Sequence, residues 1–395
     1  MLTSRTRVGV VGAGAMGTGI AQVAAAAGHE VVLADAMPGA AAKAGKAMAG
    51  TLAALVARGR LDAGVCEAIL SRIVVIDVAL GDKVRVLADC GLIIEAIVED
   101  LAAKQALFAR VAGVVSSKTV LASNTSSLAI TAIAAGCPSP ERVIGIHFFN
   151  PAPVLPLVEI IPWMGTSDAV RDACAARVAA WGKTVVTCSD TPGFIVNRVA
   201  RPFYGEALRI AEEGIADCAT IDWAMKTIGG FRMGPFELMD FVGNDVNLAV
   251  TQSVYDGFFQ DPRYRPSLTQ QRLVQAGFLG RKSGRGYFDY RDGAVPPQPA
   301  KDDNVGNAIV DRIRAMLINE AVDALNLRVA SAEAIDLAMV KGVNYPRGLL
   351  AWCDELGAAS VLATLEWLHA EYGEDRYRPS PLLRRTAREG RRFRA

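Results

Sequence analysis

Residues 7–17 read RVGVVGAGAMG, an apolar β-branched run that passes directly into a glycine-rich turn. The turn has Gly-x-Gly-x-x-Gly spacing, formed by Gly12, Gly14 and Gly17. The first glycine permits a tight turn, the second lets a pyrophosphate approach the backbone, and the third allows a helix to pack closely on the strand. Because the turn follows a strand and opens a helix, it predicts the first βα unit of a Rossmann-type, dinucleotide-binding domain.

A second predicted strand ends in VVLAD, which places Asp35 at its carboxyl end. A carboxylate there accepts hydrogen bonds from the adenosine ribose and repels a 2′-phosphate. The next basic residue is Lys43, so the pattern favours NAD over NADP. A flavin dinucleotide is the competing ligand, since it uses the same turn. The predicted cofactor contacts are Gly12, Ala13, Gly14, Ala15, Met16, Gly17 and Asp35.

The first half of the chain alternates short β-branched runs with alanine-rich helical segments, which predicts a parallel sheet covered by helices on both faces. Strand signals stop at Pro192, and helical patterns follow, beginning at 193–214 and 220–228. The fold is therefore predicted to be an α/β Rossmann-type domain, residues 1–190, followed by an all-α region. The predicted strands are 8–11, 31–34, 73–76, 92–95, 120–122, 143–146, 158–161 and 185–187.

The all-α region is predicted to contain one helical domain twice. IVNR at 195–198 recurs as IVDR at 309–312, an offset of 114 residues, and RYRPS occurs at both 263–267 and 376–380. The first offset also pairs Glu206 with Glu320, Asp222 with Asp336, Met225 with Met339, Gly234 with Gly348, Asp240 with Asp354 and Gly243 with Gly357. The predicted parts are a first copy over 191–293, a proline-rich linker over 294–304 and a degenerate second copy over 305–395.

The composition excludes several classes of protein. Lysine and arginine number 42 against 41 acidic residues, so no net field attracts nucleic acid or an anionic membrane. Seven cysteines without a CxxC pair indicate reduced thiols, with neither a disulfide framework nor a metal site. No apolar run reaches the ~20 residues of a membrane span, and the early first strand leaves no room for a signal peptide. A cytoplasmic protein is expected.

His147 is the predicted catalytic base among three histidines. It ends the apolar run VIGI and so lies at the carboxyl end of a strand, where open α/β sheets bind their ligands. Imidazole suits removal of a hydroxyl proton during hydride transfer, because its charge changes near neutral pH. His29, in a turn, and His369, on a helix, are interpreted as structural.

Glu159 is the candidate partner of this histidine. It lies inside the apolar strand LVEII, where an unpaired carboxylate is costly. The intervening segment carries three prolines and is predicted to turn the chain back. The alternative is an edge strand on which Glu159 faces water. Two further polar sites, SNTSS at 123–127 and Asn197, are as readily explained by a helix N-cap and a surface residue.

A series of strings resembles the 3-hydroxyacyl-CoA dehydrogenase family over about residues 7–290. The resemblance implies NAD-dependent oxidation of a 3-hydroxyacyl-CoA to the 3-ketoacyl-CoA, with short chains favoured. Its longer bacterial members, named for 3-hydroxybutyryl- or 3-hydroxyadipyl-CoA, carry a second helical copy. The strings are GAGAMGTGIAQVAAAAGHEVVLAD, EAIVEDLAAKQALF, ASNTSSL, IGIHFFNPAPVLPLVEII, DTPGFIVNR, MGPFELMDFVG and RKSGRGYFDY.

The resemblance also implies roles for individual residues. Glu159 would pair with the base His147, and the implied positions near the reacting groups and substrate are Ser126, Asn150 and Asn197. The positions implied near NAD, besides the turn, are Glu99, Lys104, Ser126 and Lys282. Because Asp311 replaces Asn197 in the second copy, which has no Rossmann segment before it, one active site per chain is expected.

Alternatives remain open at this point. A dehydrogenase of the same fold acting on a free hydroxy or sugar acid, such as gulonate, is the nearest, and a non-catalytic NAD-binding protein is another. A CoA thioester needs cationic surface, which Lys43, Lys46, Arg58 and Arg60 can supply unless they form a solvated helix face. The second copy is expected to pack on the first as an intrachain pseudo-dimer, and a homodimer is also possible.

Overall fold

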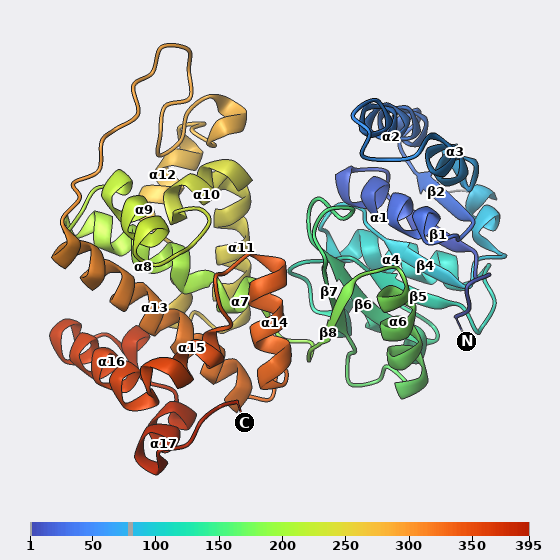
Figure 1. Cartoon of the computed structure of the whole chain (residues 1–395). Helices are drawn as coiled ribbons and strands as arrows, with labels where there is room; N and C mark the ends of the chain where they lie inside the picture. The colour runs from blue at the N-terminus through green and yellow to red at the C-terminus, as the bar shows by residue number, and fades with distance from the viewer. Residues whose placement is uncertain (1, 78–81, 395) are drawn as a thin grey trace. The chain divides into compact units, whose positions relative to one another are not determined.

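The computed structural model describes residues 2–77 and 82–394 (Figure 1). The chain divides into two compact units, Met1–Thr191 and Pro192–Ala395. Among the described residues, no helix is long and apolar enough to cross a membrane.

The first unit is built on an eight-stranded sheet of order β3-β2-β1-β4-β5-β6-β7-β8. All eight predicted strands are present, and β1 to β6 run parallel as predicted. The strands are β1 (Val8–Val11), β2 (Val31–Asp35), β3 (Ile73–Asp77), β4 (Leu92–Glu95), β5 (Val120–Ser123), β6 (Val143–Phe148), β7 (Leu157–Ile161) and β8 (Thr184–Thr187). The helices are α1 (Ala15–Ala26), α2 (Ala40–Ala57), α3 (Ala63–Ser71), α4 (Leu101–Ala112), α5 (Ile130–Ala135) and α6 (Asp168–Ala180).

The predicted parallel sheet ends at β6, because β7 pairs antiparallel with β6 and β8 runs parallel to β7. The segment 149–156 that joins β6 to β7 is too short for a helical crossover, which needs a dozen or more residues. The register sets His147 directly opposite Glu159. Because β8 pairs with the other side of β7, Glu159 does not lie on an edge strand.

The second unit is helical. The helical pattern predicted over 193–214 is divided between two helices, α7 (Val196–Val199) and then α8, which begins at Arg201 with Pro202 in its first turn. Proline has no backbone N–H and is tolerated only in the first turn of a helix. The other helices are α9 (Cys218–Thr227), α10 (Pro235–Val242), α11 (Asn244–Gly257), α12 (Leu268–Gln275), α13 (Asp303–Asn326), α14 (Ala332–Gly342), α15 (Leu349–Leu356), α16 (Ala358–Tyr372) and α17 (Pro381–Glu389), with α8 ending at Glu212.

The helices of the second unit follow the 114-residue offset seen in the sequence. The first residues of α9, α10 and α11 precede those of α14, α15 and α16 by that interval. The described residues 294–302 between the two sets carry neither helix nor strand (Figure 1).

Candidate active site

The glycine-rich turn between β1 and α1 has the geometry that a dinucleotide needs. Gly12 has φ +106°, and a Cβ on it would lie 2.3 Å from the carbonyl oxygen of Ala96. A Cβ on Gly17 would lie 1.7 Å from the carbonyl oxygen of Gly12. By contrast, no described heavy atom lies within 4 Å of the Cβ position of Gly14, so this side of the turn is open to a ligand.

The start of α1 is prepared for an anion. No side chain of the described residues caps it, so its first N–H groups are available to a phosphate. Asp35, at the end of β2, bonds the turn itself: its Oδ2 accepts from the N–H of Ala13 at 2.6 Å, and its Oδ1 accepts from Met37 N at 2.8 Å. The residues present therefore fit a dinucleotide with an unphosphorylated ribose.

A buried charge cluster lies at the ends of β4 and β5. Lys104 Nζ, on α4, is 2.6 Å from Glu95 Oε1 and 3.2 Å from Glu99 Oε2. Lys104 and Glu95 are both buried, so the ammonium group is neutralised by carboxylates of the protein itself. Glu95 was not predicted as a site residue. The signal for it is a carboxylate in the apolar strand LIIE, the same signal that singled out Glu159.

The SNTSS segment is held by these carboxylates. Glu99 Oε1 accepts from the hydroxyls of Thr125 at 2.5 Å and Ser127 at 2.8 Å, and from Ser126 N at 3.1 Å. Burial acts to raise the pKa of Glu99, but Lys104 and the two hydroxyls outweigh it, so the pKa lies below the ordinary value of a glutamate. The N-cap interpretation of this segment is wrong, since α5 begins later, after Ala129. The hydroxyls instead fix a loop at the carboxyl end of the sheet.

His147 and Glu159 meet across β6 and β7, with His147 Nδ1 2.7 Å from Glu159 Oε2. The residues are 5% and 0% exposed. A carboxylate on Nδ1 selects the tautomer protonated there, which makes Nε2 the nitrogen that accepts a proton. Asn124 Oδ1 also accepts from the N–H of Phe148 at 2.8 Å, which ties the SNTSS loop to the strand that carries His147.

The remaining predicted residues occupy varied positions. Asn150 is exposed beyond the end of β6, and Ser126 is half-buried in the SNTSS loop. In the second unit, Asn197 is half-buried on α7, and Lys282 Nζ forms an exposed ion pair with Asp245 Oδ1 at 2.6 Å. Four basic residues that could bind CoA are exposed on or just after α2: Lys43, Lys46, Arg58 and Arg60.

His29, which was interpreted as structural, is buried. Its Nδ1 lies 2.7 Å from the carbonyl oxygen of Thr6.

A buried histidine–carboxylate pair on the same sheet as a dinucleotide turn suits one chemistry, the removal of a hydroxyl proton while hydride leaves the neighbouring carbon. The first unit is therefore that of a dinucleotide-dependent dehydrogenase. Family models agree: "3-hydroxyacyl-CoA dehydrogenase, NAD binding domain" matches residues 7–191, and "3-hydroxyacyl-CoA dehydrogenase, C-terminal domain" matches 193–290 and 309–395. The chain belongs to the 3-hydroxyacyl-CoA dehydrogenase family, and its cofactor is NAD.

Individual relatives cover different shares of the chain. It is 40% identical to the 3-hydroxyadipyl-CoA dehydrogenase of Escherichia coli K12 over 98% of both chains. It is 42% identical to the 3-hydroxybutyryl-CoA dehydrogenase of Bradyrhizobium diazoefficiens, over 73% of this chain and 97% of the relative. A crystal structure of a 3-hydroxybutyryl-CoA dehydrogenase from E. coli K12 superposes with a TM-score of 0.91 at 39% identity, covering 98% of this chain and 99% of the other.

Proposed function

We propose that the protein oxidises short-chain (S)-3-hydroxyacyl-CoA thioesters, such as 3-hydroxybutyryl-CoA, to 3-ketoacyl-CoA thioesters in cytoplasmic fatty-acid or related acyl-CoA metabolism. The observation that carries the proposal is the buried His147–Glu159 pair at 2.7 Å, on the same sheet as the dinucleotide turn. Relatives named for 3-hydroxybutyryl-CoA and 3-hydroxyadipyl-CoA support the thioester class without distinguishing the acyl group. A buried base with its own carboxylate argues against a non-catalytic NAD-binding protein.

The pair supports a mechanism in which His147 Nε2 takes the proton of the 3-hydroxyl. Glu159 stabilises the imidazolium that forms, and in the reverse direction the imidazolium protonates the developing alkoxide. The glycine-rich turn and the start of α1 would hold NAD, which would supply the acceptor for the hydride of C3. Ser126, held through Glu99 and Lys104, is proposed to donate a hydrogen bond to the 3-oxygen. Asn150 and Asn197 are proposed to contact the substrate, and Lys282 the cofactor.

NADH oxidation distinguishes the thioester class from the free acids. Wild-type protein is tested with acetoacetyl-CoA, longer 3-ketoacyl-CoA thioesters, free acetoacetate and a keto sugar acid. Turnover of the thioesters, with little or none of the free acids, is expected. Activity on the free acids alone would contradict the proposed function.

Asp35→Ser is expected to weaken the binding of NAD and to reduce the discrimination against NADP. The substitution removes both the acceptor for Ala13 N and the charge that repels a 2′-phosphate. Hydrogen bonds to charged groups contribute about 1.5–3 kcal/mol, so kcat/KM for NAD should fall roughly ten- to hundredfold. Steady-state kinetics with both cofactors measures the effect. Asp77→Ser, at the end of the neighbouring β3, is the matched control and should leave the NAD/NADP ratio unchanged.

We also propose that 191–293 and 305–395 are two copies of one helical domain, joined by the linker 294–304. Beyond the matching helices, one polar contact recurs at the same offset. The Asp222 carboxylate accepts from the N–H groups of residues 236 and 237, and the Asp336 carboxylate accepts from those of 350 and 351. A Cβ on Gly234 or Gly348 would lie 2.3 Å from the corresponding aspartate, so each copy needs glycine there.

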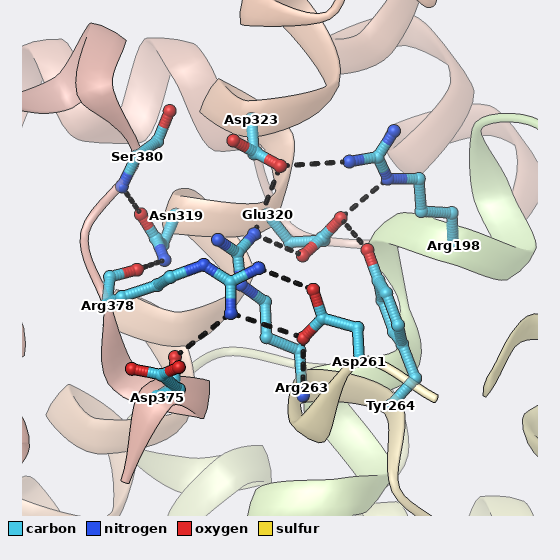
Figure 2. A network of polar contacts seen from close by, with 10 residues as sticks. All are labelled: Arg198, Asp261, Arg263, Tyr264, Asn319, Glu320, Asp323, Asp375, Arg378 and Ser380. Carbon is cyan, nitrogen blue, oxygen red and sulfur yellow. Dashed lines mark hydrogen bonds and ion pairs between the residues drawn. The ribbon is translucent and has the colours of Figure 1, made fainter. Parts of the chain in front are cut away.

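The two copies bind each other reciprocally. Arg198 Nε donates to Glu320 Oε1 at 2.6 Å, and Arg312 Nε donates to Glu206 Oε2 at 3.0 Å. Since Arg312 and Glu320 are the 114-residue counterparts of Arg198 and Glu206, each copy's arginine binds the other copy's glutamate. Tyrosines repeat the pattern, with Tyr264 bonding Glu320 (Figure 2) and Tyr377 bonding Glu206. Such reciprocity is typical of a two-fold homodimer interface, and it supports an intrachain pseudo-dimer.

Removal of residues 301–395 is expected to expose this face of the first copy. The truncated chain should dimerise through it or lose stability, because Arg198 would lose Glu320 and Asp323, and Glu206 would keep only Arg209, 3.5 Å away, of the cations that the structure describes. Sedimentation and thermal unfolding of the truncated and full chains measure the two effects. A truncated protein that stays monomeric and fully stable would show that the pseudo-dimer is wrong.

A further inference from the structure

One buried arginine of the second unit has only neutral neighbours. Arg201, on α8, is 6% exposed. Its Nε donates to the carbonyl of Asn197 at 2.7 Å, its Nη1 donates to Thr251 Oγ1 at 3.0 Å, and its guanidinium lies 4.9 Å from the centre of the Tyr204 ring. Among the described residues, no carboxylate forms an ion pair with it.

Other buried arginines of the chain show how unusual this is. Arg198, Arg312 and Arg376 each pair with carboxylates. Arg142, in the first unit, has no such pair but donates to three backbone carbonyls, one of them at the end of α4. A buried cation without an anion is costly, and burial lowers the pKa of Arg201 accordingly. A bound anion would offset this cost.

A second buried donor lies nearby and also lacks an acceptor. Tyr345, in the loop between α14 and α15, is 4% exposed, and its hydroxyl has no hydrogen-bond partner among the described residues. Its ring contacts Phe203, which lies two residues after Arg201 on α8, and the Arg201 charge acts to lower the Tyr345 pKa that burial raises. Its ring is held by aromatic contacts, 5.0 Å from Phe231 and 5.7 Å from Phe203 between ring centres. A guanidinium and a phenol together suit the two oxygens of a carboxylate.

Neither donor is required by the repeated helical fold. At the 114-residue offset, Arg201 corresponds to Ala315, and Tyr345 corresponds to Phe231. Alanine fills the position of Arg201 in the second copy, and phenylalanine fills the position of Tyr345 in the first copy. The helical domain therefore packs with an apolar residue at either position. The arginine comes from the first copy and the tyrosine from the second, so both copies are needed to bring the donors together.

The pair also lies near a residue assigned to the substrate. Arg201 follows Asn197 by one helical turn, a rise of ~5.4 Å, and bonds its carbonyl. Asn197 is the residue of this unit that is proposed to contact the acyl group. An acyl chain that passes Asn197 can therefore bring a group at its far end to Arg201.

We propose that Arg201 and Tyr345 bind the terminal carboxylate of a dicarboxylic acyl group. The preferred substrate is then the CoA thioester of a 3-hydroxy dicarboxylic acid, such as the adipyl compound. This inference rests on the proposed function and adds the identity of the acyl end. The second helical copy thereby has a part in substrate selection, in addition to packing.

The wild-type enzyme gives the first test. The values of kcat/KM are compared for 3-hydroxyadipyl-CoA and for 3-hydroxyhexanoyl-CoA, which has the same chain length but no carboxylate. A preference of about ten- to hundredfold for the dicarboxylic substrate is expected from charged hydrogen bonds. Equal values, or a preference for the hexanoyl compound, would overturn the inference. Absence of turnover with either thioester would instead contradict the proposed function.

Two substitutions test the residues themselves. Arg201→Met and Tyr345→Phe should each lower the adipyl/hexanoyl ratio of kcat/KM, Arg201→Met to about one and Tyr345→Phe by several-fold. Arg201→Lys, which keeps the charge, should retain part of the preference. Tyr287→Phe is the matched control, because the Tyr287 hydroxyl is also buried without a partner among the described residues.

A structural role for these residues predicts a different result. In that case Arg201→Met would lower both rates equally and leave the ratio as in wild type, which would overturn the inference. Should that variant fail to fold, Tyr345→Phe decides, since it removes one hydroxyl and keeps the ring. An unchanged ratio in Tyr345→Phe, as in Tyr287→Phe, would exclude Tyr345 from carboxylate binding.

Discussion

His147→Gln is expected to lower kcat for acetoacetyl-CoA reduction by about 10²–10⁴-fold, the usual contribution of a general acid–base. Glutamine can fill the space beside Glu159 but cannot accept the 3-hydroxyl proton or return it. NADH binding should change little, because the dinucleotide turn lies on β1 and α1. Steady-state kinetics and fluorescence titration of NADH separate the two effects. A variant that keeps most of its turnover would show that His147 is not the base.

His29→Gln is the matched control for this substitution. His29 is also a buried histidine of the first unit, and its ring contacts Trp181 as well as the carbonyl of Thr6. Its replacement should cost stability and leave kcat near the wild-type value. A similar loss of kcat in both variants would mean that the effect of His147→Gln is structural.

Glu320→Ala is expected to lower the free energy of unfolding of the second unit by about 3–5 kcal/mol, as breaking a buried ion pair does. Figure 2 shows why: Glu320 accepts from Arg198 and from the hydroxyl of Tyr264, and Arg263 lies 3.4 Å from its Oε2. Without the carboxylate, the Tyr264 hydroxyl loses its acceptor, and the two buried arginines keep only Asp323 as an acidic partner among the described residues. Urea unfolding measures the change. Glu366→Ala, which breaks an exposed pair with Arg384, should cost less than about 1 kcal/mol.

The same cluster predicts a loss of stability in acid. Burial alone would raise the pKa of Glu320, but Arg198 and Arg263 hold it below the ordinary glutamate value of 4.5. A carboxylate with a lowered pKa in the folded state stabilises the fold above its unfolded pKa, and this contribution is lost as the pH falls through the folded pKa. Below about pH 4, the free energy of unfolding should therefore fall less steeply with decreasing pH in Glu320→Gln than in wild type. Equal slopes would mean that the cluster does not contribute.

Local patterns were sufficient for the elements, and the prolines of 149–156 predicted a turn back, but the parallel sheet expected from strand–helix alternation ends at β6. The positions of the strands follow from β-branched runs, and Gly12 and Asp35 follow from spacing. Strand direction at β7 depends instead on the length of the preceding connection. That length was visible in the sequence, in the short segment 149–156. The break at Pro202 likewise has a local cause, since proline belongs in a first helical turn.

The site residues that escaped prediction depend on contacts between distant segments. Glu95 carried the same sequence signal as Glu159, a carboxylate in an apolar strand, but its partners Lys104 and Ser123 come from other segments of the chain. Arg201 and Tyr345 look unremarkable in the sequence, because an arginine on a helix is usually exposed. Burial and the lack of an acidic partner set them apart, and neither property can be read from residue spacing.

The fate of the hydrogen on C3 tests the central proposal most directly. Wild-type protein is given NAD and (S)-3-hydroxybutyryl-CoA carrying deuterium at C3, and the resulting NADH is analysed by mass spectrometry. The proposed reaction predicts NADH that carries the deuterium, together with acetoacetyl-CoA. Unlabelled NADH, or labelled NADH formed only from the free hydroxy acid, would contradict hydride transfer from a 3-hydroxyacyl thioester.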